Sequence, residues 1–263
     1  MTSKKLLFTL GADPELFLRS KEGLYISSIG KFGGTKQQPK SVGKGCAIQE
    51  DNVAVEFNIP PAGSLQEFDE SLQYSMNVLQ ERAKELNLSL AIDASAEFSA
   101  DQLNSPQAKQ FGCEPDFNAW TMQQNPRPTA ANQSLRSCGG HVHVGTDLNI
   151  IDVIRAMDLF LGCPSTIMDK DTRRRELYGK AGSFRNKPYG GEYRTLSNYW
   201  IKSSDTIKWV YDQTERALNW VSENTTDNSV EWDKEVAGAI QHCINKGDKD
   251  AYMFLDKKYG FGL

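Results

Sequence analysis

The sequence predicts an α+β protein in which an antiparallel sheet precedes a helical C-terminus. Strand-like segments dominate residues 1–200, with helices interspersed, and three helical patterns occupy residues 204–263. Strands followed by helices, rather than strictly alternating with them, are typical of α+β domains with antiparallel sheets. A chain of 263 residues is long enough for one large domain or two small ones.

The first third of the chain carries three strand-like runs and one long helical pattern. The runs are KLLFTLGADPELFLR, GLYISSIG and AVEFNIPPA. We expect the glycine- and lysine-rich segment 30–45, between the second and third runs, to be a mobile loop or a hairpin arm. Apolar residues recur every three or four positions from Leu65 to Leu86, which predicts a helix, and Ser64 with Glu67 predicts a capping box at its start.

The remaining elements are predicted from the same periodicities. A short strand, LSLAIDAS, precedes an irregular segment over 99–137, and the strand CGGHVHVGTD follows at 138–147. We expect a helix near 151–161, then loop and strand up to the last three helices. Those helices are predicted near 204–223, 231–245 and 248–258, with Gly247 ending the second.

Composition excludes several classes of protein. The net charge of −4 offers no basic footprint, so we expect no non-specific nucleic-acid binding. No apolar segment approaches the roughly 20 residues that span a bilayer, so no membrane partner is expected. The five cysteines are scattered without a C-x-x-C pair, which favours a reduced cytoplasmic protein. The P-loop pattern G-x-x-x-x-G-K-[ST] does not occur.

Four expected strands each place two polar residues on one face, because side chains alternate along a strand. The pairs are Asp13 and Glu15, Glu56 and Asn58, His141 and His143, and Glu192 and Arg194. A solvent-facing strand would account for any single pair, but solvent faces usually mix lysine, threonine, serine and glutamate. If the strands share a sheet, one face carries helices and the other carries carboxylates, histidines and an arginine.

Carboxylates gathered on one face need neutralisation. Two carboxylates about 4 Å apart repel by roughly 4 kcal/mol at an effective dielectric of 20. Carboxylates with a histidine suit Mg²⁺ or Mn²⁺, and such a cation could hold nucleotide phosphates while arginines take the charge that develops on transfer. Two alternatives stay open: a His-x-His metal-dependent hydrolase or oxygenase, and a non-catalytic binding protein.

In combination, HVHVG, the E-x-R strand, the early acidic strand and VEFNIPP resemble the carboxylate–amine ligases of the glutamine synthetase and glutamate–cysteine ligase superfamily. The stretches DNVAVEFNIPPAGS and YGKAGSFRNKPYGGEYRTLSNYW resemble the small phage-associated amidoligases, the type 2 COOH–NH2 ligases. The resemblance covers roughly residues 8–200. It implies a sheet like that of the glutamine synthetase catalytic domain, with a polar concave face and helices on the other face. It also implies one amidoligase catalytic domain over 1–263, encoded by a phage and acting in the host cytoplasm.

The resemblance implies an ATP-dependent ligase that joins a small-molecule or peptide carboxylate to an amine through an acyl phosphate, with ATP and Mg²⁺ or Mn²⁺ as cofactors. The implied metal ligands are Glu15, beside Asp13, and Glu56, His141 and Glu192. The implied nucleotide contacts are His143, Lys187 and Arg185, and the implied catalytic residues are Arg185, Arg194 and Glu192. Candidates for the substrate side are Asn58, Arg175, Glu114 and Asp116, the last two also being candidates for further metal acids. The oligomeric state is left open.

Overall fold

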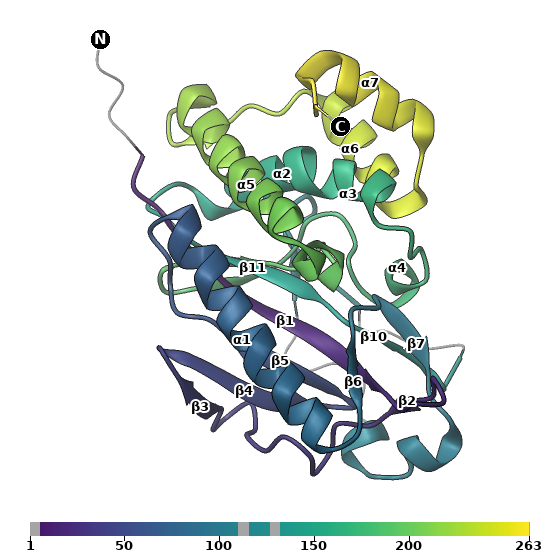
Figure 1. The fold of residues 1–263 in the computed structure, drawn as a ribbon. Helices are drawn as coiled ribbons and strands as arrows, with labels where there is room; N and C mark the ends of the chain where they lie inside the picture. The colour runs from purple at the N-terminus through teal and green to yellow at the C-terminus, as the bar shows by residue number, and fades with distance from the viewer. Residues whose placement is uncertain (1–5, 110–115, 127–131, 263) are drawn as a thin grey trace.

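The computed structural model describes residues 6–109, 116–126 and 132–262, and its centre is one large antiparallel sheet (Figure 1). The main path of this sheet runs in the order β3-β4-β5-β1-β11-β13-β12-β8-β9, and β2 and β6 pair with β1. The strands are β1 Thr9–Arg19, β2 Tyr25–Ile26, β3 Lys40–Gly43, β4 Cys46–Asp51, β5 Ala54–Asn58, β6 Ser89–Ala91, β8 Phe117–Asn118, β9 Gln123–Gln124, β11 Gly140–Gly145, β12 Ser183–Lys187 and β13 Gly190–Tyr193. The predicted fold class, α+β with an antiparallel sheet, is confirmed.

Helices and two small sheets complete the fold. The α-helices are α1 Leu65–Glu85, α2 Ile150–Met157, α3 Cys163–Met168, α4 Arg174–Leu177, α5 Ser204–Asn224, α6 Lys234–Lys246 and α7 Lys249–Tyr259. The shorter helical turns are η1 Ala100–Leu103, η2 Gln107–Lys109, η3 Asp158–Gly162 and η4 Asn198–Lys202. The small sheets pair β7 Ser95–Glu97 with β10 Leu135–Ser137, and β14 Thr225–Thr226 with β15 Ser229–Val230. The predicted helical C-terminus is present, and no described helix is long and apolar enough to cross a bilayer.

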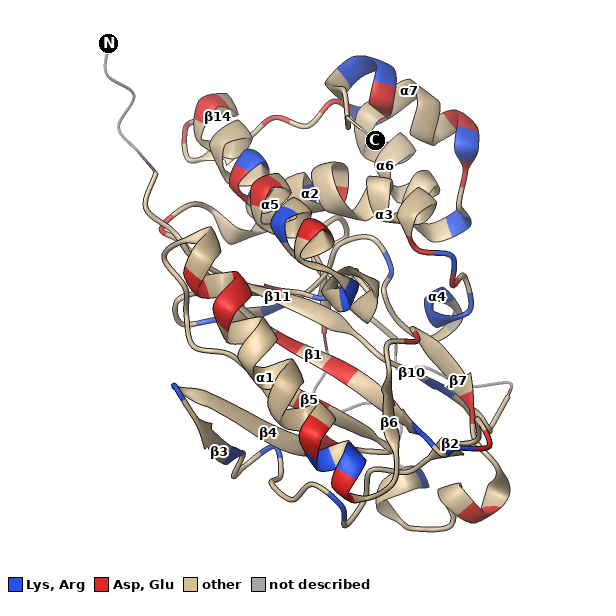
Figure 2. Ribbon diagram, viewed as in Figure 1, with Lys and Arg blue, Asp and Glu red and all other residues tan. Residues whose placement is uncertain are grey.

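The two faces of the sheet differ in chemistry. Val142 and Val144 of β11, and Val55 and Phe57 of β5, are fully buried in the main core. Helix α1 packs against β1 and β4, α2 packs against β12 and β13, and α5 lies against both helices (Figure 1). Charged residues of both signs follow the outer surfaces of α5 and α7, whereas the acidic residues of β1 lie within the sheet (Figure 2). The opposite face of the sheet is therefore where polar side chains gather.

Helix α1 begins where the sequence predicts, with one change in its cap. The Ser64 hydroxyl accepts a hydrogen bond from the Glu67 backbone N–H at 3.2 Å, as in a capping box. The Glu67 carboxylate, however, accepts from the backbone N–H of Gly63 at 2.8 Å rather than from that of Ser64. The helix buries the predicted apolar face against the sheet.

The glycine-rich segment 30–45 includes a hairpin arm, because β3 pairs with β4. Its first part is tied to β4 by one side chain, since the Glu50 carboxylate accepts from the backbone N–H groups of Gly30, Phe32 and Gly33 at 2.7, 2.8 and 2.8 Å. Phe32 is fully buried in the core. The hairpin arm is thus anchored by both a carboxylate and an apolar side chain.

A buried carboxyl group interrupts the helix that the sequence predicts near 151–161. Helix α2 ends at Met157 and continues as the π-helical turn η3, which begins with Asp158. Asp158 is fully buried and accepts four hydrogen bonds from distant segments. The donors are Trp120 Nε1 at 2.7 Å, Gly182 N at 2.5 Å, Tyr193 Oη at 2.9 Å and Thr195 Oγ1 at 3.2 Å. Asp158 thereby links the helical layer to β13.

We expect Asp158→Asn to destabilise the fold by about 1–3 kcal/mol, because an amide nitrogen would face donors that then lack an acceptor. Burial raises the pKa of Asp158 to about 7 against the effect of its donors, so the folded state binds this proton more tightly. This group therefore makes stability fall as pH rises from its ordinary value of 3.8 towards 7.

Urea unfolding at neutral pH measures the effect, with the exposed Asp147→Asn as the matched control. The control should change stability by no more than about 0.5 kcal/mol. Equal stability of the two variants would mean that Asp158 does not link the two layers.

Candidate functional site

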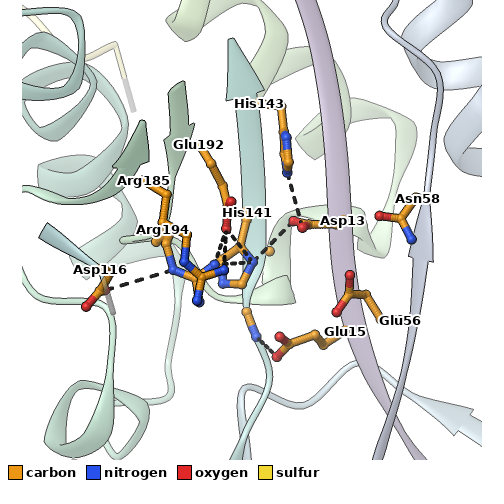
Figure 3. Close-up of polar contacts among 12 residues, drawn as sticks. Asp13, Glu15, Glu56, Asn58, Asp116, His141, His143, Arg185, Glu192 and Arg194 are labelled. Carbon is orange, nitrogen blue, oxygen red and sulfur yellow. Dashed lines mark hydrogen bonds and ion pairs between the residues drawn. The ribbon is translucent and has the colours of Figure 1, made fainter. Parts of the chain in front are cut away.

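A cavity of about 740 Å³ opens on the polar face of the sheet. Its walls come from β1, β4, β5, β11, β12 and β13, together with the segment before β3 and helix α4. The lining residues that the sequence singled out are Asp13, Glu15, Glu56, Asn58, Asp116, His141, His143, Arg185, Lys187, Glu192 and Arg194. All four predicted polar pairs therefore share one face of one sheet (Figure 3).

Strand register brings these residues together. The four strands that carry the pairs are consecutive in the sheet, in the order β5-β1-β11-β13. The residues that face one another in the register are Asp13 and His141, Glu15 and Glu56, and Glu192 with His143 and Arg185. Facing Cβ atoms in antiparallel strands lie about 4.5–5.5 Å apart, so residues distant in the chain become direct neighbours.

The first group of neighbours, which we call the histidine cluster, consists of Asp13, His141 and Glu192. One potential ligand atom from each lies within 4.8 Å of the others. The Nδ1 atom of His141 is 3.2 Å from Asp13 Oδ1 and 3.8 Å from Glu192 Oε1. The strand histidine is therefore aimed at two carboxylates from neighbouring strands.

The second group, the carboxylate cluster, consists of Glu15, Asp51 and Glu56. Their oxygens also lie within 4.8 Å of one another. The amide of Gln49 donates to Glu56 Oε1 at 2.9 Å, and the backbone N–H of Gly139 donates to Glu15 Oε2 at 2.7 Å. These bonds hold two of the three carboxyl groups in place.

The carboxylate cluster resists ionisation. Burial raises the pKa of Glu56 well above its usual range, and the charges of Asp13, Asp51 and Glu15 add to the effect. Burial and the charge of Asp51 raise the pKa of Glu15 to about 7. A divalent cation would remove this repulsion, and a set of oxygen ligands is the set that Mg²⁺ prefers. The donor chemistry of the cluster therefore fits the expected metal.

In the histidine cluster, by contrast, the pKa of the carboxyl group of Asp13 is lowered rather than raised. Burial acts to raise the pKa of Asp13, but the charges and hydrogen bonds of His143 and His141 hold it well below its usual range. Burial, with the nearby charge of Arg194, lowers the pKa of His141 to about 4, so its imidazole is neutral at pH 7. An ionised carboxylate beside a neutral imidazole is the protonation state that metal ligation requires. This cluster fits a divalent cation as well.

Cations surround Glu192. Burial opposes its ionisation, but the charge of Arg194, with smaller effects of His141 and Arg185, lowers its pKa to about 2. Lys187 Nζ lies 2.8 Å from Glu192 Oε2, Arg185 Nη1 lies 3.4 Å from Oε1, and Arg194 also contacts Oε1.

One further carboxylate approaches this group, since Asp116 Oδ2 is 3.9 Å from Arg194 Nε. Three cations thus gather at Glu192, and their donor groups suit the oxygens of an anion in the cavity.

Two of the substrate-side candidates are placed differently from the others. Arg175 donates to the Ser165 hydroxyl of α3 at 3.3 Å and does not line the cavity, whereas its neighbour Arg174 does. Successive residues of a helix point about 100° apart, so only one of them can face the cavity from this turn of α4. Glu114 lies outside the described residues.

The sequence analysis missed a fifth polar pair, Gln49 and Asp51 on β4. The pair has the same i and i+2 spacing as the others, in the stretch CAIQED that directly precedes β5. A hairpin turn at Asn52, whose φ is 56°, joins the two strands. The alternation in CAIQED was the available signal. It would have been recognised if this stretch had been predicted as a strand that forms a hairpin with β5.

The comparison with protein families agrees with the resemblance drawn from the sequence. Residues 129–245 match the model of the family described as phage phiEco32-like COOH.NH2 ligase-type 2, which confirms the resemblance to the type 2 carboxylate–amine ligases. A solved structure titled "Apo GmaS without ligand" aligns over 97% of this chain and 68% of its own, with 9% identity and a TM-score of 0.39. That likeness is too weak to carry an argument. The search of curated proteins found no match.

We expect Glu56→Gln to raise the melting temperature when divalent ions are absent. A glutamine keeps the acceptor oxygen for Gln49 but removes a carboxyl group whose pKa is raised by burial and by the neighbouring acids. The same variant should lose the part of the Mn²⁺ stabilisation that comes from the carboxylate cluster, because this cluster then lacks a charged ligand.

Differential scanning calorimetry with and without Mn²⁺ measures both effects. Glu85→Gln, on the exposed side of α1, is the control and should behave like the wild type. An Mn²⁺ effect of wild-type size in Glu56→Gln would remove the carboxylate cluster as a cation site.

Proposed function

We propose that the protein is an ATP-dependent carboxylate–amine ligase, encoded by a phage and acting in the host cytoplasm. One observation carries the proposal: two clusters that fit divalent cations and a group of cations around Glu192 line the same cavity. The match of residues 129–245 to a carboxylate–amine ligase family supports the same reaction class. The partners would be a small-molecule or peptide carboxylate and an amine.

In this proposal the metal ligands are divided between the two clusters. Glu15 and Glu56, joined by Asp51, would hold one ion, and His141 and Glu192, joined by Asp13, would hold another. Bound Mg²⁺ or Mn²⁺ would supply the charge that neutralises phosphate oxygens. The Gln49 side-chain amide and the Gly139 backbone N–H orient Glu56 and Glu15, respectively, before the ion binds.

The cations beside the histidine cluster would hold the nucleotide and stabilise the transferred group. Lys187 and Arg185 would contact phosphate oxygens, and Arg194 with Arg185 would take up the charge that develops during transfer. His143, expected as a nucleotide contact, lines the same cavity, but its two ring nitrogens face Tyr189 and Asp13. The substrate carboxylate would attack the γ-phosphorus and release ADP. The amine would then attack the acyl carbon, lose a proton and displace phosphate. Asn58 and Asp116 also line the cavity, at opposite sides of the site (Figure 3), and would contact the substrates.

The alternative hydrolase or oxygenase would need both histidines on one ion. Both histidines lie near Asp13, but among the described residues the group of ligand atoms within 4.8 Å of one another that contains His141 does not contain His143. A non-catalytic binding protein would not need three cations gathered around a buried carboxylate. The geometry thus favours the ligase over both alternatives.

An ADP-release screen tests the proposal. Purified protein is supplied with ATP, Mg²⁺ or Mn²⁺, and mixtures of carboxylates with amines, including peptides and polyamines. The expected result is ADP release that requires both substrate classes and yields an amide detectable by mass spectrometry. ATP-independent cleavage by protein that retains zinc or iron would replace the ligase with the hydrolase or oxygenase.

We expect Arg194→Lys and Arg185→Lys to fold, to bind ATP within about tenfold of the wild type, and to lose ADP release. Lysine keeps the charge but not the planar fork that matches phosphate and carboxylate. Loss of one donor to a developing charge typically costs about 2.7–4 kcal/mol, or roughly 10²–10³ in turnover. Calorimetry for binding and a coupled ADP assay for turnover measure the two effects.

Wild-type turnover combined with a lower melting temperature would give these arginines a structural role. Arg19→Lys provides the matched control, because Arg19 pairs with Asp93 at the far end of β1.

We expect His141→Ala to weaken Mn²⁺ and nucleotide binding far more than His242→Ala does. His141 belongs to the histidine cluster, whereas His242 lies on α6 and outside the cavity lining. Isothermal titration of both variants at matched stability measures the difference. Equal effects of the two variants would show that His141 is not part of the proposed cation site.

A further inference from the structure

A continuous chain of contacts runs from the rim of the cavity into the histidine cluster. Tyr189, whose side chain is 48% exposed, places its hydroxyl 2.6 Å from His143 Nδ1. The other ring nitrogen of His143 lies 3.1 Å from Asp13 Oδ2. The second oxygen of Asp13 lies 3.2 Å from His141 Nδ1. The carboxylate of Asp13 therefore lies between the imidazoles of His141 and His143, and the Tyr189 hydroxyl contacts the imidazole of His143.

Backbone contacts hold the turn that carries Tyr189, without any contribution from the Tyr189 side chain. Tyr189 lies in the tight turn between β12 and β13, after Pro188, whose ring fixes φ. Its carbonyl oxygen accepts from the Thr146 backbone N–H at 3.0 Å, which ties the turn to the end of β11. The next residue must be glycine, because Gly190 has a φ of 144° and a Cβ there would clash with the Val144 carbonyl oxygen. Removing the phenol hydroxyl should leave this turn in place.

The contact between Tyr189 and His143 is available in either protonation state of the ring. The phenol oxygen can donate to a neutral Nδ1 or accept from a protonated one, so the hydroxyl holds this side of the imidazole in both cases. The other ring nitrogen faces Asp13 Oδ2. The two rings are also close to parallel, at 27° with centroids 6.2 Å apart.

We propose that Tyr189 is a positioning residue that holds the ring of His143 and, through it, fixes the carboxylate of Asp13 for cation binding. Nothing in the polar-pair pattern identified Tyr189, because it lies in a turn rather than on a strand face. The inference rests on the proposed function only in taking the histidine cluster as a cation site. Without the hydroxyl, the imidazole can rotate and Asp13 Oδ2 loses its fixed partner. Partners outside the ligand set commonly orient ligands in metal sites in this way.

The test compares Tyr189→Phe with Tyr25→Phe. Tyr25 is a suitable control because its hydroxyl also makes side-chain hydrogen bonds, to Arg19 and Asp93, and does so at β2 outside the cavity lining. The chain has only three histidines, so long-range ¹H–¹⁵N spectra of the labelled protein resolve each imidazole. Tyr189→Phe should shift the His143 Nδ1 signal, because that nitrogen loses its side-chain partner, and Tyr25→Phe should leave all three rings unchanged.

The second measurement is the affinity for Mn²⁺, which reports on the histidine cluster. Tyr189→Phe should weaken Mn²⁺ binding by about tenfold, the low end of the losses seen when partners of metal ligands are removed. Unchanged His143 signals, or changed signals with wild-type Mn²⁺ affinity, would overturn the proposal. Both readouts are independent of turnover. A wild-type protein that binds Mn²⁺ but neither binds nor hydrolyses ATP would defeat the proposed function and leave this comparison decisive.

Discussion

The register of the central strand β1 is the constraint on which the rest of the structure depends. Leu16 of β1 and Val142 of β11 are fully buried on one face, so the opposite face must carry Asp13, Glu15 and His141. Each such apolar side chain contributes about 1.5–3 kcal/mol when buried, and a slip of one residue would exchange the two faces. Repulsion between adjacent carboxylates, roughly 4 kcal/mol per pair, is smaller than the sum over the core, so the core sets the register. The acidic residues are brought together as a consequence.

This arrangement leaves unfavourable electrostatics in the cavity that a ligand can relieve. The raised pKa values of Glu15 and Glu56 mean that the carboxylate cluster binds protons more tightly in the folded state, so stability falls as pH rises through neutrality in the absence of cations. On the apolar side of the sheet, Asp158 ties the helices to β13 through hydrogen bonds to Tyr193 and the strand end, and its own raised pKa gives it a pH dependence of the same sign. Sites of function commonly carry such strain, because a binding site must be organised before its ligand arrives.

The sequence predicted the parts of this structure that follow from local periodicity. The alternation around Asp13, Glu56, His141 and Glu192 identified the polar face, since a strand's period needs no knowledge of its partners. The anchoring of the hairpin arm by Glu50 and the division of the helix at Asp158 depend on contacts with distant segments, which periodicity does not encode. Arg174 rather than Arg175 lines the cavity, and this depends on the residue at which the one-turn helix α4 begins. Sequence patterns place such a boundary only to within a residue or two.

The central claim is that the register of β1 builds two cation sites beside one nucleotide site. X-ray diffraction at the manganese absorption edge, from crystals grown with Mn²⁺ and a non-hydrolysable ATP analogue, tests it most directly. The account predicts anomalous peaks in both the histidine cluster and the carboxylate cluster, with the terminal phosphate against Arg185 and Lys187. Manganese bound elsewhere, or a nucleotide outside the cavity, would contradict it.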